Sequence, residues 1–247
     1  MQRLLVGAED PDLIATVPAA RREAARNATA AVVMYVGLGP WRAGELRGPP
    51  GHYGLLVLEG LLAREVSVGH RSCVELLGAG DLLKPWTGLG DDSTIAIDAR
   101  WDVRSELRIA VLDRAFAQHT APFPEIGAAL MDRLLRRSRW LAFHLAVCHL
   151  PKLETRLRVV FWYIADRWGR VTPDGIVVPL RLTHDLLGGL VGAQRSPVSR
   201  ALRRLADTGS VVRQNDGTWR IRGDPPPELP DTQARAVGGE PAPARSG

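Results

Sequence analysis

The sequence predicts an α+β protein with a β-rich N-terminal half, one long helix, and two short C-terminal helices followed by a hairpin. Three observations support this prediction. Between residues 30 and 121, short apolar runs alternate with turns that contain Gly or Pro. Residues 125–150 then keep one apolar stripe at helical spacing. Residues 182–222 have the pattern of a helix, a tight turn, a second helix and a hairpin.

Length and composition are those of a protein that folds around a core. The chain has 247 residues, of which 45% are hydrophobic and 24% are charged. No apolar run reaches the roughly 18 residues that a membrane span needs, and residues 1–10 lack the pattern of a secretory signal. Cys73 and Cys148 are too few for a disulfide framework and suit a reducing compartment. We expect a cytoplasmic protein with no membrane partner.

The N-terminal half is predicted to be a polar extension followed by a β domain. In the extension, residues 1–29, we expect a short helix over residues 12–27 with Leu13, Ile14 and Val17 on one face. The strand-length runs that follow are 31–36, 52–60, 61–68, 72–78, 94–98 and 106–113. Many short strands at this spacing are typical of an antiparallel sandwich, roll or small barrel.

Residues 125–150 are predicted to form a single long helix. The apolar stripe is Ile126, Leu130, Leu134, Leu141, Leu145 and Cys148. A long helix with one apolar seam usually needs a partner helix, which the same chain or a second copy can supply. Arg137 lies near the seam, so its guanidinium has to snorkel to solvent or pair with an acidic group.

The chain then continues into a smaller helical segment and a Pro-rich tail. Pro151 ends the long helix, and residues 152–168 form a second helix that Gly169 is placed to cap. Residues 176–180 are expected to form a short strand. The tail, residues 224–247, has almost no large apolar side chain, so we expect it to be disordered.

The pattern over residues 182–209 is that of a helix-turn-helix. Thr183 is a residue type that caps helices, and Gly192 stands where a tight turn needs positive φ. Gln194 can cap the next helix, whose first turn tolerates Pro197. The expected buried faces are Leu186, Leu187, Leu190 and Val191 on the first helix, and Val198, Ala201, Leu202 and Leu205 on the second.

Residue chemistry and charge point to double-stranded DNA as the partner. Residues 151–223 carry 13 basic and 6 acidic side chains, a net charge of +7, whereas residues 1–150 carry 17 of each. The second helix of such a motif enters the major groove, where an Arg fork can donate two hydrogen bonds to guanine. The hairpin over residues 210–222 would be the wing. Candidate DNA-binding residues are Thr183, Gln194, Arg195, Ser196, Ser199, Arg200, Arg203, Arg213 and Arg220.

Residues 182–209 resemble the DNA-binding helices of the CRP/FNR superfamily of bacterial transcription regulators. The resemblance rests on Val191-Gly192, followed by Arg195, Val198, Ser199 and Arg200. It implies that Arg195 and Arg200 contact bases, with Arg203 beside them. Ser196 stands where the family often has an acidic residue, which puts the family's usual operator half-site in doubt.

The rest of the chain fits the same family in order. Looser matches over 57–66 and 76–83 imply an antiparallel β-roll (a double-stranded β-helix, cyclic-nucleotide-binding-like) over residues 30–121. A dimerisation helix over 122–150 and a winged helix-turn-helix over 151–223 follow. The resemblance therefore also implies a homodimer that pairs through residues 125–150.

The family's cyclic nucleotide site is not matched. Lys84-Pro85-Trp86 stands where the family has Gly-Glu, and Asp91 and Asp92 stand near the position of its phosphate-binding Arg. Two carboxylates would repel a phosphate, so we expect no binding of cyclic AMP or GMP. No Cys precedes Cys73, which excludes the family's N-terminal iron–sulfur cluster.

Two further groups of residues have a chemical and a structural interpretation. His144 and Cys148 could supply metal ligands across a dimer seam, but a buried thiol and a hydrogen-bonded or partly exposed His are the expected interpretation, so we predict no metal and no cofactor. Trp41, Trp86 and Trp101 could line a ligand cavity, and core packing is the expected alternative. Cys73 could be a redox sensor, and inert core is the expected alternative.

The sequence therefore predicts a sequence-specific transcription regulator that acts as a homodimer on a palindromic site. The alternative is a constitutive or architectural DNA-binding protein with a ligand-free roll. An enzyme is disfavoured, because no Walker loop, GxSxG or HExxH motif is present and no catalytic residues can be assigned. RNA polymerase and a small-molecule effector other than cyclic AMP are further candidate partners. The operator, the effector and the regulated genes are not encoded in any recognisable pattern.

Overall fold

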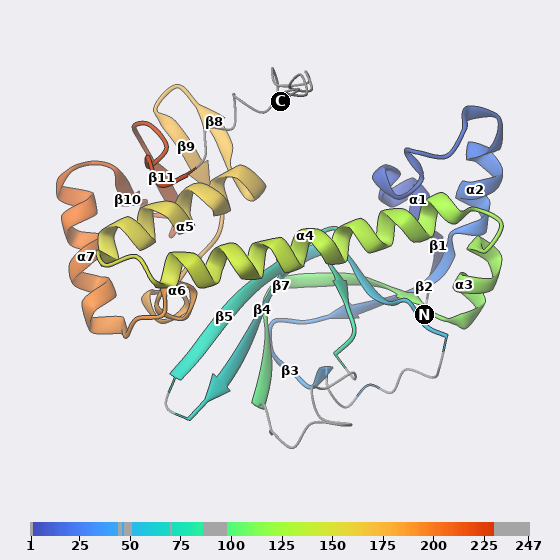
Figure 1. Ribbon diagram of the computed structural model, residues 1–247, viewed down its shortest axis with the longest axis horizontal. Coiled ribbons are helices and arrows are strands. Elements are labelled where there is room, and N and C mark those ends of the chain that lie inside the picture. The colour runs from blue at the N-terminus through green and yellow to red at the C-terminus, as the bar shows by residue number, and fades with distance from the viewer. Residues whose placement is uncertain (1, 44–45, 47–50, 70, 86–97, 230–247) are drawn as a thin grey trace, which may run out of the picture. The chain divides into compact units, whose positions relative to one another are not determined.

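The computed structural model describes residues 2–43, 46, 51–69, 71–85 and 98–229 (Figure 1). The chain divides into two compact units. Unit 1 is made of residues 1–149 and 185–194, and unit 2 of residues 150–184 and 195–247. The predicted α+β class is confirmed, since an antiparallel sheet, a long helix and a helix-turn-helix follow one another. No helix in the described part of the chain has the length and apolarity to cross a bilayer.

Unit 1 is built on one antiparallel sheet with the strand order β1-β2-β7-β4-β5. The strands are β1 (Gln2–Leu5), β2 (Ala30–Val36), β3 (Gly39–Trp41), β4 (Gly54–Val68), β5 (Arg71–Gly78), β6 (Leu82–Leu83) and β7 (Asp98–Leu112). The two long strands, β4 and β7, pair along most of their length, while β3 pairs with β7 and β6 with β4. The predicted strand over 94–98 lies outside the described residues, except for its end.

Gly60 joins two runs that the sequence analysis treated as separate strands. Residues 54–68 form the single strand β4, and the register with β7 shifts between Val57 and Leu62. Gly60 has φ +99°, and a Cβ there would lie 2.2 Å from the carbonyl oxygen of Glu106. A bulge at a glycine bends a strand without ending it, which lets β4 continue around the roll.

The N-terminal extension belongs to unit 1 and folds in short pieces. The single helix predicted over 12–27 is wrong: η1 (Pro11–Ile14), η2 (Ala19–Arg21) and α2 (Arg22–Ala28) replace it. Pro18 explains the break, because it lacks an N–H and disfavours a helical residue before it. Before these pieces come β1, which pairs with β2, and α1 (Val6–Glu9), neither of which the sequence predicted. Leu13, Ile14 and Val17 are buried as expected.

The long helix α4 (Pro124–Cys148) follows α3 (Arg114–Thr120) and confirms the helix predicted over 125–150. Its first two apolar positions, Ile126 and Leu130, join a core cluster with Phe116. The later positions differ, because Leu134, Leu141 and Leu145 are 39%, 36% and 65% exposed. The apolar stripe therefore divides into a half that packs on its own unit and a half that is left at the surface of the described chain.

Unit 2 combines two helices with a small antiparallel sheet. The helices are α5 (Leu153–Trp168) and α7 (Arg195–Asp207). The sheet has the order β10-β11-β9-β8, from β8 (Arg170–Thr172), β9 (Gly175–Val178), β10 (Val211–Arg213) and β11 (Trp219–Ile221). Phe161 of α5 packs on Trp219 with ring centroids 5.0 Å apart. The expected tail is described only to residue 229, and residues 230–247 lie outside the described part.

Candidate DNA-binding interface

A tight turn at Gly192 separates α6 (His184–Val191) from α7. Gly192 has φ +64°, the left-handed conformation that the sequence predicted for this position. The four apolar residues predicted to be buried on α6 are buried. The backbone N–H of Ala193 donates to the carbonyl oxygen of Gly188 at 2.9 Å and so closes the C-terminal end of α6. A single glycine thus lets the chain leave one helix and start another.

The outer face of α7 carries most of the predicted site residues. Arg195, Ser196, Arg200 and Arg203 are exposed, whereas Val198, Ala201, Leu202 and Leu205 are buried as predicted. Arg200 Nη1 donates to Ser196 Oγ one turn earlier at 3.3 Å. Within the described residues, no acidic side chain pairs with Arg200 or Arg203. Their guanidinium groups are therefore available to a polyanion.

Ser199 is engaged inside the protein to a degree that the sequence did not show. Its hydroxyl donates to the carbonyl oxygen of Arg195, four residues earlier, at 3.0 Å. The same oxygen lies 2.7 Å from Nδ1 of His184. Ser199 is half-buried, unlike the arginines beside it. No periodicity could have predicted His184 as its partner, because 15 residues separate the two.

The wing is the hairpin of β10 and β11. Asp216 holds its turn by accepting from the backbone N–H and the hydroxyl of Thr218 at 2.9 and 2.7 Å. Arg213 is exposed at the end of β10. Arg220 is half-buried, and its Nη2 donates to Gln214 Oε1 at 2.7 Å. Arg213 is thus the more available of the two arginines predicted to hold phosphates.

Arg204 lies on α7 but outside the predicted set, and an ion pair holds it. Its Nη1 is 2.6 Å from Oε1 of Glu154, which stands in the first turn of α5. Hydrogen bonds from the backbone N–H of Glu154 and from Arg204 lower the pKa of the Glu154 carboxyl. This contact joins α7 to the helix behind it.

The remaining two predicted residues, Thr183 and Gln194, lie on either side of α6. Both are exposed and neither is helical. The predicted residues are therefore grouped on α7 and the wing hairpin of unit 2, with Thr183 at the start of α6 and Gln194 directly before α7.

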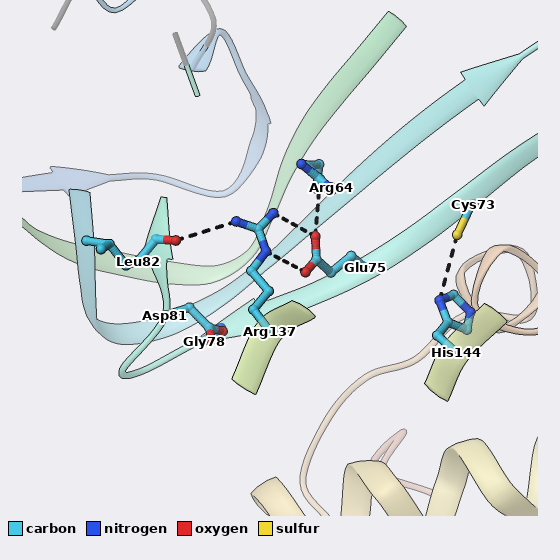
Figure 2. Close-up of polar contacts among 8 residues, drawn as sticks. All are labelled: Arg64, Cys73, Glu75, Gly78, Asp81, Leu82, Arg137 and His144. Carbon is cyan, nitrogen blue, oxygen red and sulfur yellow. Dashed lines mark hydrogen bonds and ion pairs between the residues drawn. The ribbon is translucent and has the colours of Figure 1, made fainter. Parts of the chain in front are cut away.

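Arg137, the arginine predicted to lie near the seam of α4, belongs to an ion-pair cluster in unit 1 (Figure 2). Arg137 donates from Nε and Nη2 to the two carboxylate oxygens of Glu75 at 2.7 and 2.9 Å. Arg64 lies 3.1 Å from the same carboxylate, which is only 3% exposed. Of the two outcomes expected for Arg137, snorkelling or pairing, the structure shows pairing, and the pair joins α4 to β5.

His144 is buried and hydrogen-bonded. Its Nε2 forms a hydrogen bond with the carbonyl oxygen of Leu190. Its Nδ1 lies 3.7 Å from Cys73 Sγ (Figure 2). Burial lowers the pKa of His144. No group of three metal-ligating side chains gathers among the described residues. Cys73 is exposed on β5, so the expectation that it is core is wrong.

The roll's expected ligand features are described only in part. Residues 90–94, where this sequence lacks the family's phosphate-binding Arg, lie outside the described residues, and so does Trp86. Trp41 and Trp101 meet edge to face with centroids 6.3 Å apart, and Trp101 belongs to a core cluster. For these two rings, core packing is the observed role.

Comparison with known proteins identifies the C-terminal region. Residues 155–223 match the Crp-like helix-turn-helix domain. The structure is similar to a mutant of CooA from Carboxydothermus hydrogenoformans, with 18% identity, TM-score 0.59, and 78% of this chain and 84% of that chain covered. It is also similar to FixK2 from Bradyrhizobium japonicum, with 16% identity, TM-score 0.59, and 87% of this chain and 99% of that chain covered. A third similar structure is TTHA1359, a CRP/FNR family transcriptional regulator from Thermus thermophilus, with 19% identity, TM-score 0.53, and 78% of this chain and 94% of that chain covered. No curated protein matches the chain.

Proposed function

We propose that this chain is a sequence-specific DNA-binding regulator of transcription. It carries a Crp-like helix-turn-helix domain and has the fold of CRP/FNR-type transcription regulators. The resemblance predicted from residues 182–209 is confirmed. The finer parts of the proposal are a homodimer, a palindromic site, and modulation by an effector other than cyclic AMP.

The exposed outer face of α7 is the observation that carries the proposal. Arg195, Ser196, Arg200 and Arg203 all point away from the core that the opposite face of the same helix makes. Arginine forks at the N-terminal half of such a helix suit the O6 and N7 acceptors of guanine. Exposed Arg213 on the wing supports a phosphate contact beside the groove.

Exposed apolar side chains along α4 support the homodimer. A row of apolar side chains is exposed there: Met131, Leu134, Leu135, Leu141 and Leu145. Met131 and Leu135 lie four residues apart, and so do Leu141 and Leu145. Leu134 and Leu141 lie seven residues apart, one heptad, which suits the seam of a two-stranded coiled coil. Two copies joined along this row would carry two copies of α7, which suits half-sites about 34 Å apart on a two-fold symmetric duplex.

An effector would act through the equilibrium between two arrangements of the dimer. A ligand that binds one arrangement more tightly shifts the population toward it, and DNA affinity follows. Asp91 and Asp92 argue against a cyclic nucleotide in this role, because their charges oppose a phosphate.

Selection of bound duplexes from random DNA tests the proposal. The expected result is an enriched, two-fold symmetric motif with half-sites about one helical turn apart. Footprinting of the selected site then separates the regulator from an architectural protein, because a regulator protects one site and an architectural protein covers the duplex evenly. Even coverage without an enriched motif would contradict sequence-specific regulation.

A further inference from the structure

We propose that His184 is a positioning residue for DNA recognition, which holds Ser199 so that its hydroxyl presents only a lone pair to the operator. The operator position opposite Ser199 would then carry a base with an amino group in the major groove. The inference rests on the proposed function and names a specificity element within it.

The geometry around Ser199 is closed on two sides. Its oxygen lies 2.7 Å from His184 Nδ1 and 3.0 Å from the carbonyl oxygen of Arg195. His184 in turn packs beside Trp219 of the wing, with ring centroids 6.4 Å apart. Trp219 is 2% exposed, so the imidazole lies between Ser199 of α7 and a buried ring of the wing. His184 therefore connects α7 to the wing.

Counting protons fixes what Ser199 can offer to DNA. A hydroxyl has one proton and two lone pairs. When the Ser199 proton goes to the Arg195 carbonyl, His184 Nδ1 must carry a hydrogen and donate it to Ser199 Oγ, which leaves one lone pair. When the proton goes to Nδ1 instead, both lone pairs remain. In both arrangements the hydroxyl's only proton stays inside the protein, and turning it toward DNA gives up its internal hydrogen bond.

This result narrows the role that the sequence predicted for Ser199. Phosphate oxygens, guanine O6 and N7, and thymine O4 are all acceptors, and a hydroxyl without a free proton cannot donate to them. The amino groups of adenine N6 and cytosine N4 are donors in the major groove. Ser199 would therefore favour adenine or cytosine at one position of each half-site, beside the guanines that suit Arg200.

A double-mutant cycle on the selected operator tests the proposal. The proteins are wild type, His184→Ala, Ser199→Ala, the double variant and His184→Asn, with affinities measured by fluorescence anisotropy. The duplexes are the selected site, the same site changed at the position opposite Ser199, and an unrelated duplex. Thermal unfolding of each protein shows whether the fold is kept.

The two single alanine variants are expected to lose about fivefold to tenfold in affinity for the selected site, as one hydrogen bond is worth, and to keep their affinity for the unrelated duplex. His184→Ala is expected to add no further loss in the Ser199→Ala background, because His184 acts through Ser199. His184→Asn is expected to restore affinity, since the Asn amide nitrogen stands as many bonds from the backbone as Nδ1 does. Base preference at the one position is expected to disappear in both alanine variants.

Additive losses in the double variant would overturn the proposal, and so would a Ser199→Ala protein that keeps the base preference. If His184→Ala lowers the unfolding temperature, the base preference of the Ser199→Ala protein still tests the proposal. Failure of the proposed function looks different, because wild type would then enrich no site at all. An enriched site together with additive losses removes only the role of His184.

Discussion

Glu75 joins α4 to β5 through a carboxylate that is almost fully buried. Its carboxylate is 3% exposed and accepts hydrogen bonds from Arg137 while Arg64 lies 3.1 Å away. A buried charge is tolerated only when it is paired, so removing one partner costs more than the pair itself contributes. The sequence predicted that Arg137 either snorkels or pairs but could not identify Glu75, since 62 residues separate them and only the fold brings them together.

Arg137→Met is expected to lower the free energy of unfolding by about 3 kcal/mol, because Glu75 loses both short hydrogen bonds. Arg136→Met is the matched control, since Arg136 is exposed on the same helix and its loss should change stability by about 0.5 kcal/mol or less. Urea titration of the two variants and wild type measures the difference. Equal stability of both variants would mean that Glu75 does not rely on Arg137.

His144 predicts a pH dependence of stability. Burial lowers the folded-state pKa below the ordinary 6.5, so the ring stays neutral to a lower pH in the folded protein than in the unfolded chain. The unfolded chain takes up a proton as the pH falls through about 6.5 while the folded chain does not, and stability is lost by up to about 1.4 kcal/mol per pH unit until the lowered pKa is reached. Unfolding at pH 7.5 and 5.5 should show this loss, and His144→Gln should reduce it. Identical losses in both proteins would contradict the account.

At the scale of elements, local signals predicted well and non-local ones did not. Gly192 and the apolar faces of α6 and α7 were predictable, because a positive-φ turn and helical spacing are properties of neighbouring residues. The break at Pro18 was a local signal too, but the apolar spacing of Leu13, Ile14 and Val17 concealed it. The joining of two predicted strands at Gly60 depends on β7, which lies far along the chain.

The exposed row on α4 predicts how the chain associates. Leu145→Lys should weaken the dimer by about 100-fold or more, because two leucines of about 1.5–3 kcal/mol each leave the seam. Ala146→Lys adds the same charge at an exposed position outside the row and should leave association unchanged. Sedimentation equilibrium gives the dissociation constants. A dimer that tolerates Lys at residue 145 would place the interface elsewhere.

For the whole molecule, the unequal charge of the two halves has a measurable consequence. The excess of seven basic residues in 151–223 should make DNA affinity fall steeply with salt, since each neutralised phosphate releases counterions. This prediction needs no structure, because it depends on net charge alone. The structure is needed to say which arginines supply the phosphate contacts. Arg213 is exposed, whereas Arg204 pairs with Glu154 and Arg220 donates to Gln214.

Arg213→Ala should therefore reduce the slope of log affinity against log salt by about 1 for each copy bound, with little change in which sequence is preferred. Arg222→Ala removes the same charge from a side chain that donates to the Asp174 carbonyl at 2.9 Å, and its slope should stay near that of wild type. Affinities at several salt concentrations decide. A slope that both variants change equally would reflect net charge and not a contact at Arg213.

We infer that the outer face of α7 reads bases in the major groove, and protection of guanine N7 from methylation tests this claim. On the selected site, wild type should protect a guanine in each half-site, and Arg200→Ala should lose that protection together with about 1–3 kcal/mol of affinity. Guanines that wild type leaves unprotected, or that Arg200→Ala protects as well as wild type does, would contradict the claim.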